Sequence, residues 1–140
     1  MRLTSFTDYG LRLLMRLAGE PERAFTTEEM AAFFGLSRNH LTKIVSCLAA
    51  ADIVRTRRGA GGGFTLARPA QQLSLGQIVR VLEGAPALVD CFRSDGGTCL
   101  LRGDCRLKGR LRDAADAFLR ELDRSTLADC AWPARAPVAA

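Results

Sequence analysis

The sequence has little of what secreted, membrane-spanning and most catalytic proteins need. Its first twenty residues hold no uninterrupted apolar stretch, because Arg12 and Arg16 break it, and no segment approaches the ~20 apolar residues that cross a membrane. One histidine leaves little room for general acid-base catalysis, and neither a Ser-His-Asp set nor a paired-carboxylate site is visible. We therefore expect a cytoplasmic protein that does not bind membranes and is not an enzyme.

Size and composition indicate a globular protein without room for a second full domain. The 140 residues suffice for one domain with a core, or for a compact domain with an appended oligomerisation element. Hydrophobic residues make up 48% and charged residues 25%, values that exclude a disordered or fibrous chain.

Positive charge is concentrated in one part of the chain. The net charge is +5, and residues 37–68 alone carry that excess while the remaining residues sum to zero. A solvated charged face is the simple interpretation. An excess confined to one segment of an otherwise neutral protein favours a site for a polyanion such as DNA.

The same region follows a helix-turn-helix pattern, preceded by a first helix predicted over 6–17. Thr26 and Glu29 form a capping-box pair that begins a short second helix, Gly35 ends it, and Ser37 caps the third helix. Apolar or small residues stand where the two crossing helices meet: Met30, Ala31, Phe34, Leu36, Leu41 and Ile44. This pattern predicts a DNA-binding motif rather than an ordinary antiparallel helix pair.

Two short strands are predicted next, over 53–57 and 64–68, joined by a glycine-rich connection. The connection lacks the Lys-Ser/Thr of a nucleotide-binding loop, so we expect a β-hairpin wing. Helices follow over 74–83 and from 107 onward, and the second of these carries an apolar stripe that a second copy would cover. The expected fold is mainly α with a small β-hairpin: a winged helix-turn-helix plus a long C-terminal dimerisation helix.

The third helix is expected to enter the major groove with its first turns facing the bases. The candidate contacts there are Ser37, Arg38, Asn39, His40 and Lys43. Arg pairs with guanine and Asn with adenine, whereas His40 could instead be a helix-surface residue without DNA contact. On the wing, we expect Arg57 and Arg58 in the minor groove and Arg55 at a phosphate.

A single DNA-binding module makes few phosphate and base contacts, so operator affinity usually requires two half-sites. We therefore expect a homodimer on a palindromic double-stranded operator with half-sites about 34 Å apart.

Five cysteines, an odd number, argue against a disulfide framework and favour metal ligation or thiol chemistry. Cys91, Cys99 and Cys105 lie in one loop, CFRSDGGTCLLRGDC, while Cys47 and Cys130 are expected to be small core residues. The loop has neither the C-x2-4-C knuckle of structural zinc nor the ferredoxin spacing. Its three thiolates can still converge on one face of an iron-sulfur cluster.

These elements divide the chain into four parts. We expect a winged helix-turn-helix over 1–84, a cluster-binding loop over 85–106, the dimerisation helix over 107–130 and a mobile tail over 131–140.

Five stretches together resemble the Rrf-type winged-helix regulators, and among them the nitric-oxide-sensing repressors. They are LTSFTDYGLR, SRNHLTKIV, RRGAGGG, the three-cysteine loop running into CRLK, and LDRSTLAD. The resemblance implies a homodimer with one iron-sulfur cluster per protomer, which represses nitrosative-stress genes until nitric oxide attacks the cluster. It also implies that Cys91, Cys99 and Cys105 are ligands, that Arg58 is the wing arginine and that the SRNH segment reads bases. The gap between the first two cysteines is longer than is usual for the group.

The fourth cluster ligand is not set by the loop alone. Lys108 stands where a related regulator of cluster assembly has a histidine, so that subgroup is disfavoured and carboxylates remain, at Asp8, Asp90, Asp95 or Asp104. The resemblance favours Asp8, donated across the dimer, and a [4Fe-4S] rather than a [2Fe-2S] cluster. The alternatives are a metal-free thiol-redox DNA-binding regulator, an iron-sulfur regulator of cluster or iron homeostasis, and an iron-sulfur electron carrier.

Overall fold

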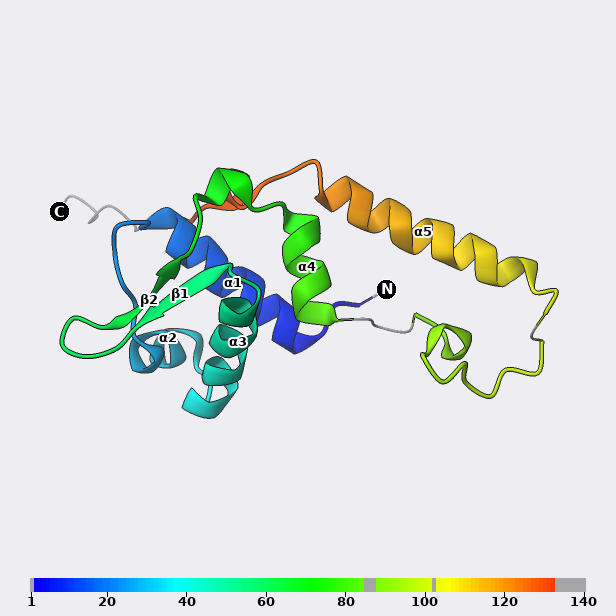
Figure 1. The fold of residues 1–140 in the computed structure, drawn as a ribbon, viewed down its shortest axis with the longest axis horizontal. Coiled ribbons are helices and arrows are strands. Elements are labelled where there is room, and N and C mark those ends of the chain that lie inside the picture. The colour runs from blue at the N-terminus through cyan, green and yellow to red at the C-terminus, as the bar shows by residue number, and fades with distance from the viewer. Residues whose placement is uncertain (1, 85–87, 102, 133–140) are drawn as a thin grey trace.

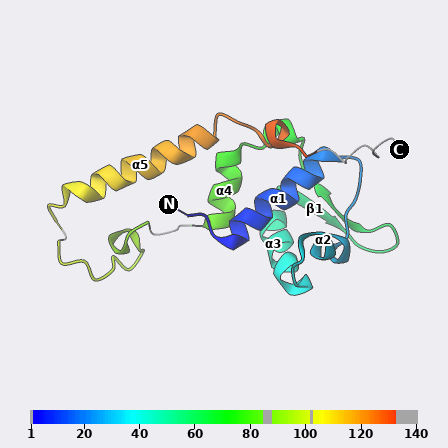
Figure 2. The same cartoon turned by 180° about the vertical axis from the view of Figure 1, so that it is seen from behind.

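The structure, a computed structural model, describes residues 2–84, 88–101 and 103–132 (Figure 1). The predicted mobile tail lies outside these residues except for Ala131 and Trp132. Helices α1 to α4 and the hairpin form one body, and α5 extends from it with the cysteine loop at the far end (Figures 1 and 2). No helix in the described parts of the chain is both long and apolar enough to cross a bilayer.

The first three helices are each begun by a hydroxyl cap. Helix α1 (Ser5–Gly19) begins after Thr4, whose hydroxyl accepts a hydrogen bond from Thr7 N–H. Helix α2 (Thr27–Phe34) and helix α3 (Arg38–Ala50) follow Thr26 and Ser37, which cap them in the same way. Between them Gly35 has a φ of +65°, a left-handed conformation that favours glycine in the tight turn. The sequence-based boundaries of these helices are confirmed to within two residues.

The core forms where these helices cross. Leu41, Ile44 and Leu48 of α3 are fully buried, as is Leu13 of α1. The predicted crossing positions are confirmed, because Met30 and Ala31 are buried, and Phe34 and Leu36 pack against the core from its edge. Their burial orients α3 so that its opposite face points to solvent.

The wing is a two-stranded antiparallel sheet of β1 (Val54–Arg57) and β2 (Gly63–Leu66), paired from Val54 with Leu66 to Arg57 with Gly63. Phe64 also exchanges two backbone hydrogen bonds with Phe25, at 2.8 and 3.0 Å, which ties the wing to the segment before α2. A side chain at Gly63 would come within 2.5 Å of the Phe25 carbonyl oxygen, so this close approach requires glycine.

Helix α4 (Leu75–Glu83) packs on α1 and α3, and α5 (Arg106–Leu122) contacts α4. Arg80 of α4 binds Asp123 through two hydrogen bonds of 2.8 and 2.6 Å at the end of α5. Short 3-10 helices cover Ala70–Gln72, Asp90–Phe92 and Leu127–Cys130. The segment over 107–130 is therefore not one helix, because the chain turns after Leu122 and returns buried Leu127 to the body. No residue of α5 is fully buried, so its apolar stripe is only partly covered in the described chain.

Candidate functional site

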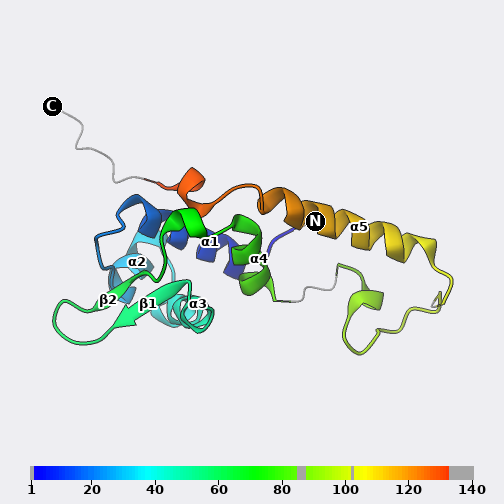
Figure 3. The ribbon, with the colours of Figure 1, turned by 45° about the horizontal axis from the view of Figure 1, so that its top comes forward.

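The cationic surface combines the start of α3 with the wing. Ser37, Arg38, Asn39 and Lys43 are exposed at or near the first turns of α3, and Arg55, Arg57 and Arg58 are exposed on the wing. Figure 3 shows α3 and the hairpin on the same side of the body, away from α5. We call these seven residues the DNA face. A helix beside a hairpin on one surface can enter a major groove while the wing follows the neighbouring backbone.

A cleft of about 460 Å³ lies between α2, α3 and the wing on this surface. Its lining includes Thr26 and Thr27 at the start of α2, Arg38 and Arg57. Glu28 also lines it, and its Oε1 lies 2.6 Å from Arg38 Nη2. Sequence reasoning missed Glu28. The available signal was its place in the first turn of α2, since the helix-turn-helix pattern puts that turn near the start of α3.

His40 has a different environment from the other predicted DNA contacts. Its ring stacks on Phe6 at a centroid distance of 6.2 Å and meets the edge of Tyr9 at 6.2 Å. His40 Nε2 is buried and has no hydrogen-bond partner in the described parts of the chain. The side chain therefore faces α1, which supports the structural interpretation of this histidine, and we leave it out of the DNA face.

The three loop cysteines line one hollow. Cys91, Cys99 and Cys105 are half-buried free thiols around a cavity of about 360 Å³, and Lys108 lines it as well. Cys105 directly precedes α5, whose unpaired backbone N–H groups favour negative charge. The structure thus places the three predicted ligands on one cavity, with two sources of positive potential beside them.

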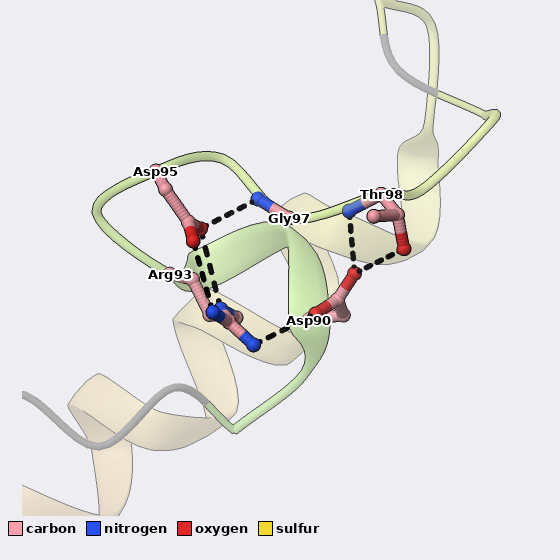
Figure 4. Close-up of polar contacts among 5 residues, drawn as sticks. All are labelled: Asp90, Arg93, Asp95, Gly97 and Thr98. Carbon is pink, nitrogen blue, oxygen red and sulfur yellow. Dashed lines mark hydrogen bonds and ion pairs between the residues drawn. The ribbon is translucent and has the colours of Figure 1, made fainter.

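A network of polar contacts closes the part of the loop between Cys91 and Cys99 (Figure 4). Asp90 accepts hydrogen bonds from Thr98 N–H at 2.7 Å and from the Thr98 hydroxyl at 3.2 Å. Asp95 accepts from Gly97 N–H at 2.9 Å and from Arg93 at 2.9 and 3.2 Å. These bonds, first that from Gly97 and then that from Arg93, hold the pKa of Asp95 below its ordinary value. We call these five residues the loop network, which sequence reasoning did not identify.

The donor set has the chemistry of an iron-sulfur cluster site. Within the described residues, no three His, Cys, Asp or Glu side chains lie close enough to hold one ion. Cluster ligands bind different irons and stand further apart than ligands of one ion, and thiolates are the usual donors. Three free thiols on one cavity supply donors of this type.

Asp8 does not line the cysteine cavity of its own chain. It lies in the first turn of α1, where Arg12 pairs with it through contacts of 2.9 and 3.0 Å. Its side chain is 48% exposed and so is accessible to a second molecule. Asp90 and Asp95 are engaged in the loop network. Asp104 is exposed and does not line the cavity either. Among the described residues, no carboxylate therefore joins the three thiols on this cavity.

The winged fold with a cationic recognition helix and wing defines a winged-helix DNA-binding regulator. Residues 3–132 match the Rrf2 family, described as iron-dependent transcriptional regulators, and the chain belongs to this family. It is 40% identical over 130 residues to the HTH-type transcriptional regulator NsrR of Halalkalibacterium halodurans, covering 92% of this chain and 89% of that one. It is 38% identical to the NsrR of Shouchella clausii, covering 92% and 87%.

Solved structures with the same fold are also transcription regulators. T. potens IscR has a TM-score of 0.72 at 28% identity, covering 92% of this chain and 85% of that chain. Oxidized Staphylococcus aureus CymR has a TM-score of 0.74 at 27% identity, covering 97% and 100%. B. subtilis CymR, the global cysteine regulator, has a TM-score of 0.70 at 30% identity, covering 94% and 96%. The predicted fold class, the resemblance and the absence of an enzymatic role are confirmed, and the chain is a transcriptional regulator.

Proposed function

We propose that the chain acts in the cytoplasm as a homodimeric repressor whose operator binding responds to nitric oxide through an iron-sulfur cluster. The observation that carries the proposal is the cavity shared by Cys91, Cys99 and Cys105. When bound there, a cluster supplies iron that nitric oxide can attack. The similarity to proteins named NsrR supports the same conclusion.

The DNA face provides the operator contacts in this proposal. The first turn of α3 presents Arg38 and Asn39 to base edges, and Arg57 and Arg58 extend from the wing toward the minor groove, with Arg55 at a phosphate. A palindromic operator follows from the second copy, because two recognition helices related by twofold symmetry read two inverted half-sites.

Helix α5 supplies the dimer contact. Its residues Leu111, Ala115, Phe118 and Leu122 recur at helical spacing, yet all remain partly exposed in the described chain. Leu107, at the end of this stripe, is 62% exposed. Covering such a stripe with the same stripe of a second copy removes apolar surface from water and stabilises the dimer.

The fourth ligand in this proposal is Asp8 from the partner's α1, since Asp8 lies outside the cavity of its own chain. The Asp8 carboxylate would have to exchange Arg12 for iron, which its half-exposed position permits. An oxygen donor binds iron less tightly than thiolate and leaves one iron accessible to a small diatomic molecule. Three thiolates with one carboxylate suit a [4Fe-4S] cluster, which has four irons to bind.

Anaerobic reconstitution with iron and sulfide tests the proposal. We expect a brown protein that shifts a palindromic duplex and releases it after stoichiometric nitric oxide. Cys99→Ser should lose the visible absorbance, whereas Cys130→Ser, which changes a half-buried cysteine outside the loop, should keep it. Operator binding that is unchanged by nitric oxide would refute the sensing role. A colourless protein whose DNA binding follows thiol oxidation would establish the metal-free alternative.

A further inference from the structure

Glu28 introduces negative charge into a surface that is otherwise suited to DNA. Among the described residues that line the cleft between α2, α3 and the wing, it is the only acid. We propose that Glu28 is a specificity-determining residue, which holds Arg38 in the free protein and penalises binding to DNA that lacks the recognised base. This inference rests on the proposed role of α3 and adds to it a residue that makes no base contact.

The geometry places Glu28 where it can act on Arg38. Arg38 is the first residue of α3, and its Nη2 lies 2.6 Å from Glu28 Oε1 in the first turn of α2. The side chains of Arg38 and Glu28 are 72% and 59% exposed. Exposed ion pairs are weak because water screens them, so a stronger acceptor can displace Glu28.

The two kinds of DNA differ in what they offer Arg38. A guanine in the operator presents O6 and N7, which accept two parallel hydrogen bonds from arginine and replace the carboxylate. DNA without that guanine offers Arg38 only phosphate. A single phosphate is no better an acceptor for Arg38 than the Glu28 carboxylate, so on such DNA the Arg38–Glu28 pair persists and Arg38 neutralises no phosphate. The wrong complex therefore lacks a contact that the operator complex gains, and the ratio of the Kd for other DNA to the Kd for the operator rises.

A purely structural role is the competing explanation for Glu28. An acid in the first turn of a helix stabilises it through the helix dipole, and Glu28 stands in that turn. Glu29 is the matched control, since it follows in the same turn and pairs with Arg23 rather than Arg38. It is absent from the lining of the cleft. Changing either residue to glutamine removes the same charge from the same helix.

The experiment uses the full chain and two duplexes of equal length. One is selected by the unaltered protein from a random pool, and the other is its scrambled version. Fluorescence anisotropy measures Kd for both as a function of salt. We expect Glu28→Gln to tighten binding to the scrambled duplex about 3- to 10-fold and to change binding to the selected duplex less than about 2-fold. The ratio of the scrambled-duplex Kd to the selected-duplex Kd should therefore fall. Its salt slope on the scrambled duplex should steepen by about 2 per dimer, because each freed Arg38 neutralises one more phosphate.

Two further variants separate the possible failures. Glu29→Gln should change neither duplex by more than about 2-fold, and Glu28→Gln should have no effect in an Arg38→Ala background. Equal effects of Glu28→Gln and Glu29→Gln would overturn the inference while leaving the role of α3 intact. Loss of selected-duplex binding in Glu28→Gln, with an unchanged thermal melt, would also overturn it. Unchanged selected-duplex binding by Arg38→Ala would overturn the role of α3 itself.

Discussion

The salt dependence of operator binding can be derived from the charges on the DNA face. On the DNA face, four exposed cations make no ion pair with any described residue: Lys43, Arg55, Arg57 and Arg58. Two other cations of the segment are engaged, because Arg38 pairs with Glu28 and the Arg68 Nε–H donates to the Asp52 carbonyl at 3.2 Å. Only the four unpaired side chains can reach phosphates without first breaking a contact.

Four cations in each protomer place about eight on a dimer. Each neutralised phosphate contributes about −0.9 to the slope of log K against log salt concentration, so we expect a slope of about −7. Doubling the salt from 100 to 200 mM should then weaken binding about 100-fold. A dimer that used only its recognition helices would have a far shallower slope, since Lys43 is the one unpaired cation on each described α3.

Fluorescence anisotropy with an operator duplex at several salt concentrations measures this slope. Arg58→Ala should make the slope shallower by about 2, because the dimer loses two cations that neutralise phosphate charge from within the minor groove. Arg124→Ala is the control, since Arg124 is exposed and paired with Glu121 near the end of α5. A slope shallower than about −3, or the same slope in Arg58→Ala, would refute the assignment of the wing to the DNA surface.

Three other outcomes test the body, the loop and the connection between them. Leu127→Ala should destabilise the protein by about 2–5 kcal/mol in chemical denaturation, because Leu127 is fully buried where the chain returns to the body. Because the pKa of Asp95 is lowered, its bond to Gly97 N–H stabilises the loop above about pH 4, and this stability is lost as the pH falls further. Amide exchange at Gly97, corrected for the intrinsic rate, should accelerate over that range. Glu83 at the end of α4 bonds Thr4, which caps α1, so this contact can connect the cysteine loop to the DNA-binding body. Glu83→Gln should keep the cluster absorbance but reduce the difference in operator affinity between protein with and without the cluster, whereas the exposed control Glu22→Gln should leave that difference unchanged. An unchanged difference in Glu83→Gln would argue against this connection.

Local signals explain why the body was predictable from sequence. Hydroxyl caps, the glycine turn and the helical spacing of buried residues act within a few positions of one another, so α2 and α3 were predicted closely. The end of α5 was predicted only in part: the apolar stripe ends at Leu122 as the helix does, whereas the dimerisation helix was assigned as far as 130. The chain turns after Leu122 because Asp123 bonds Arg80, a residue 43 positions earlier, and sequence spacing does not report such a contact.

Part of the candidate site was likewise predictable from nearby residues, and part was not. The cysteine cavity was predictable because three thiols in one short loop have few other arrangements that use them together. The environments of His40 and Arg38 were not, because each depends on a neighbour from another helix. Phe6 determines the first and Glu28 the second, and neither neighbour follows from the residues around the recognition helix itself.

The contacts of α4 suggest how the loop and the DNA face can be connected within one chain. Glu83 ends α4 just before the cysteine loop, and its Oε1 accepts hydrogen bonds from Thr4 N–H at 2.6 Å and the Thr4 hydroxyl at 3.0 Å. Thr4 caps α1, which carries Phe6 and Tyr9 against His40 of the recognition helix. A displacement of the loop that moved Glu83 would therefore act on α1 and, through packed rings, on α3. Packed side chains transmit small shifts because interiors resist compression. In such a connection, the ring contact of His40 would act whether or not the histidine touches DNA.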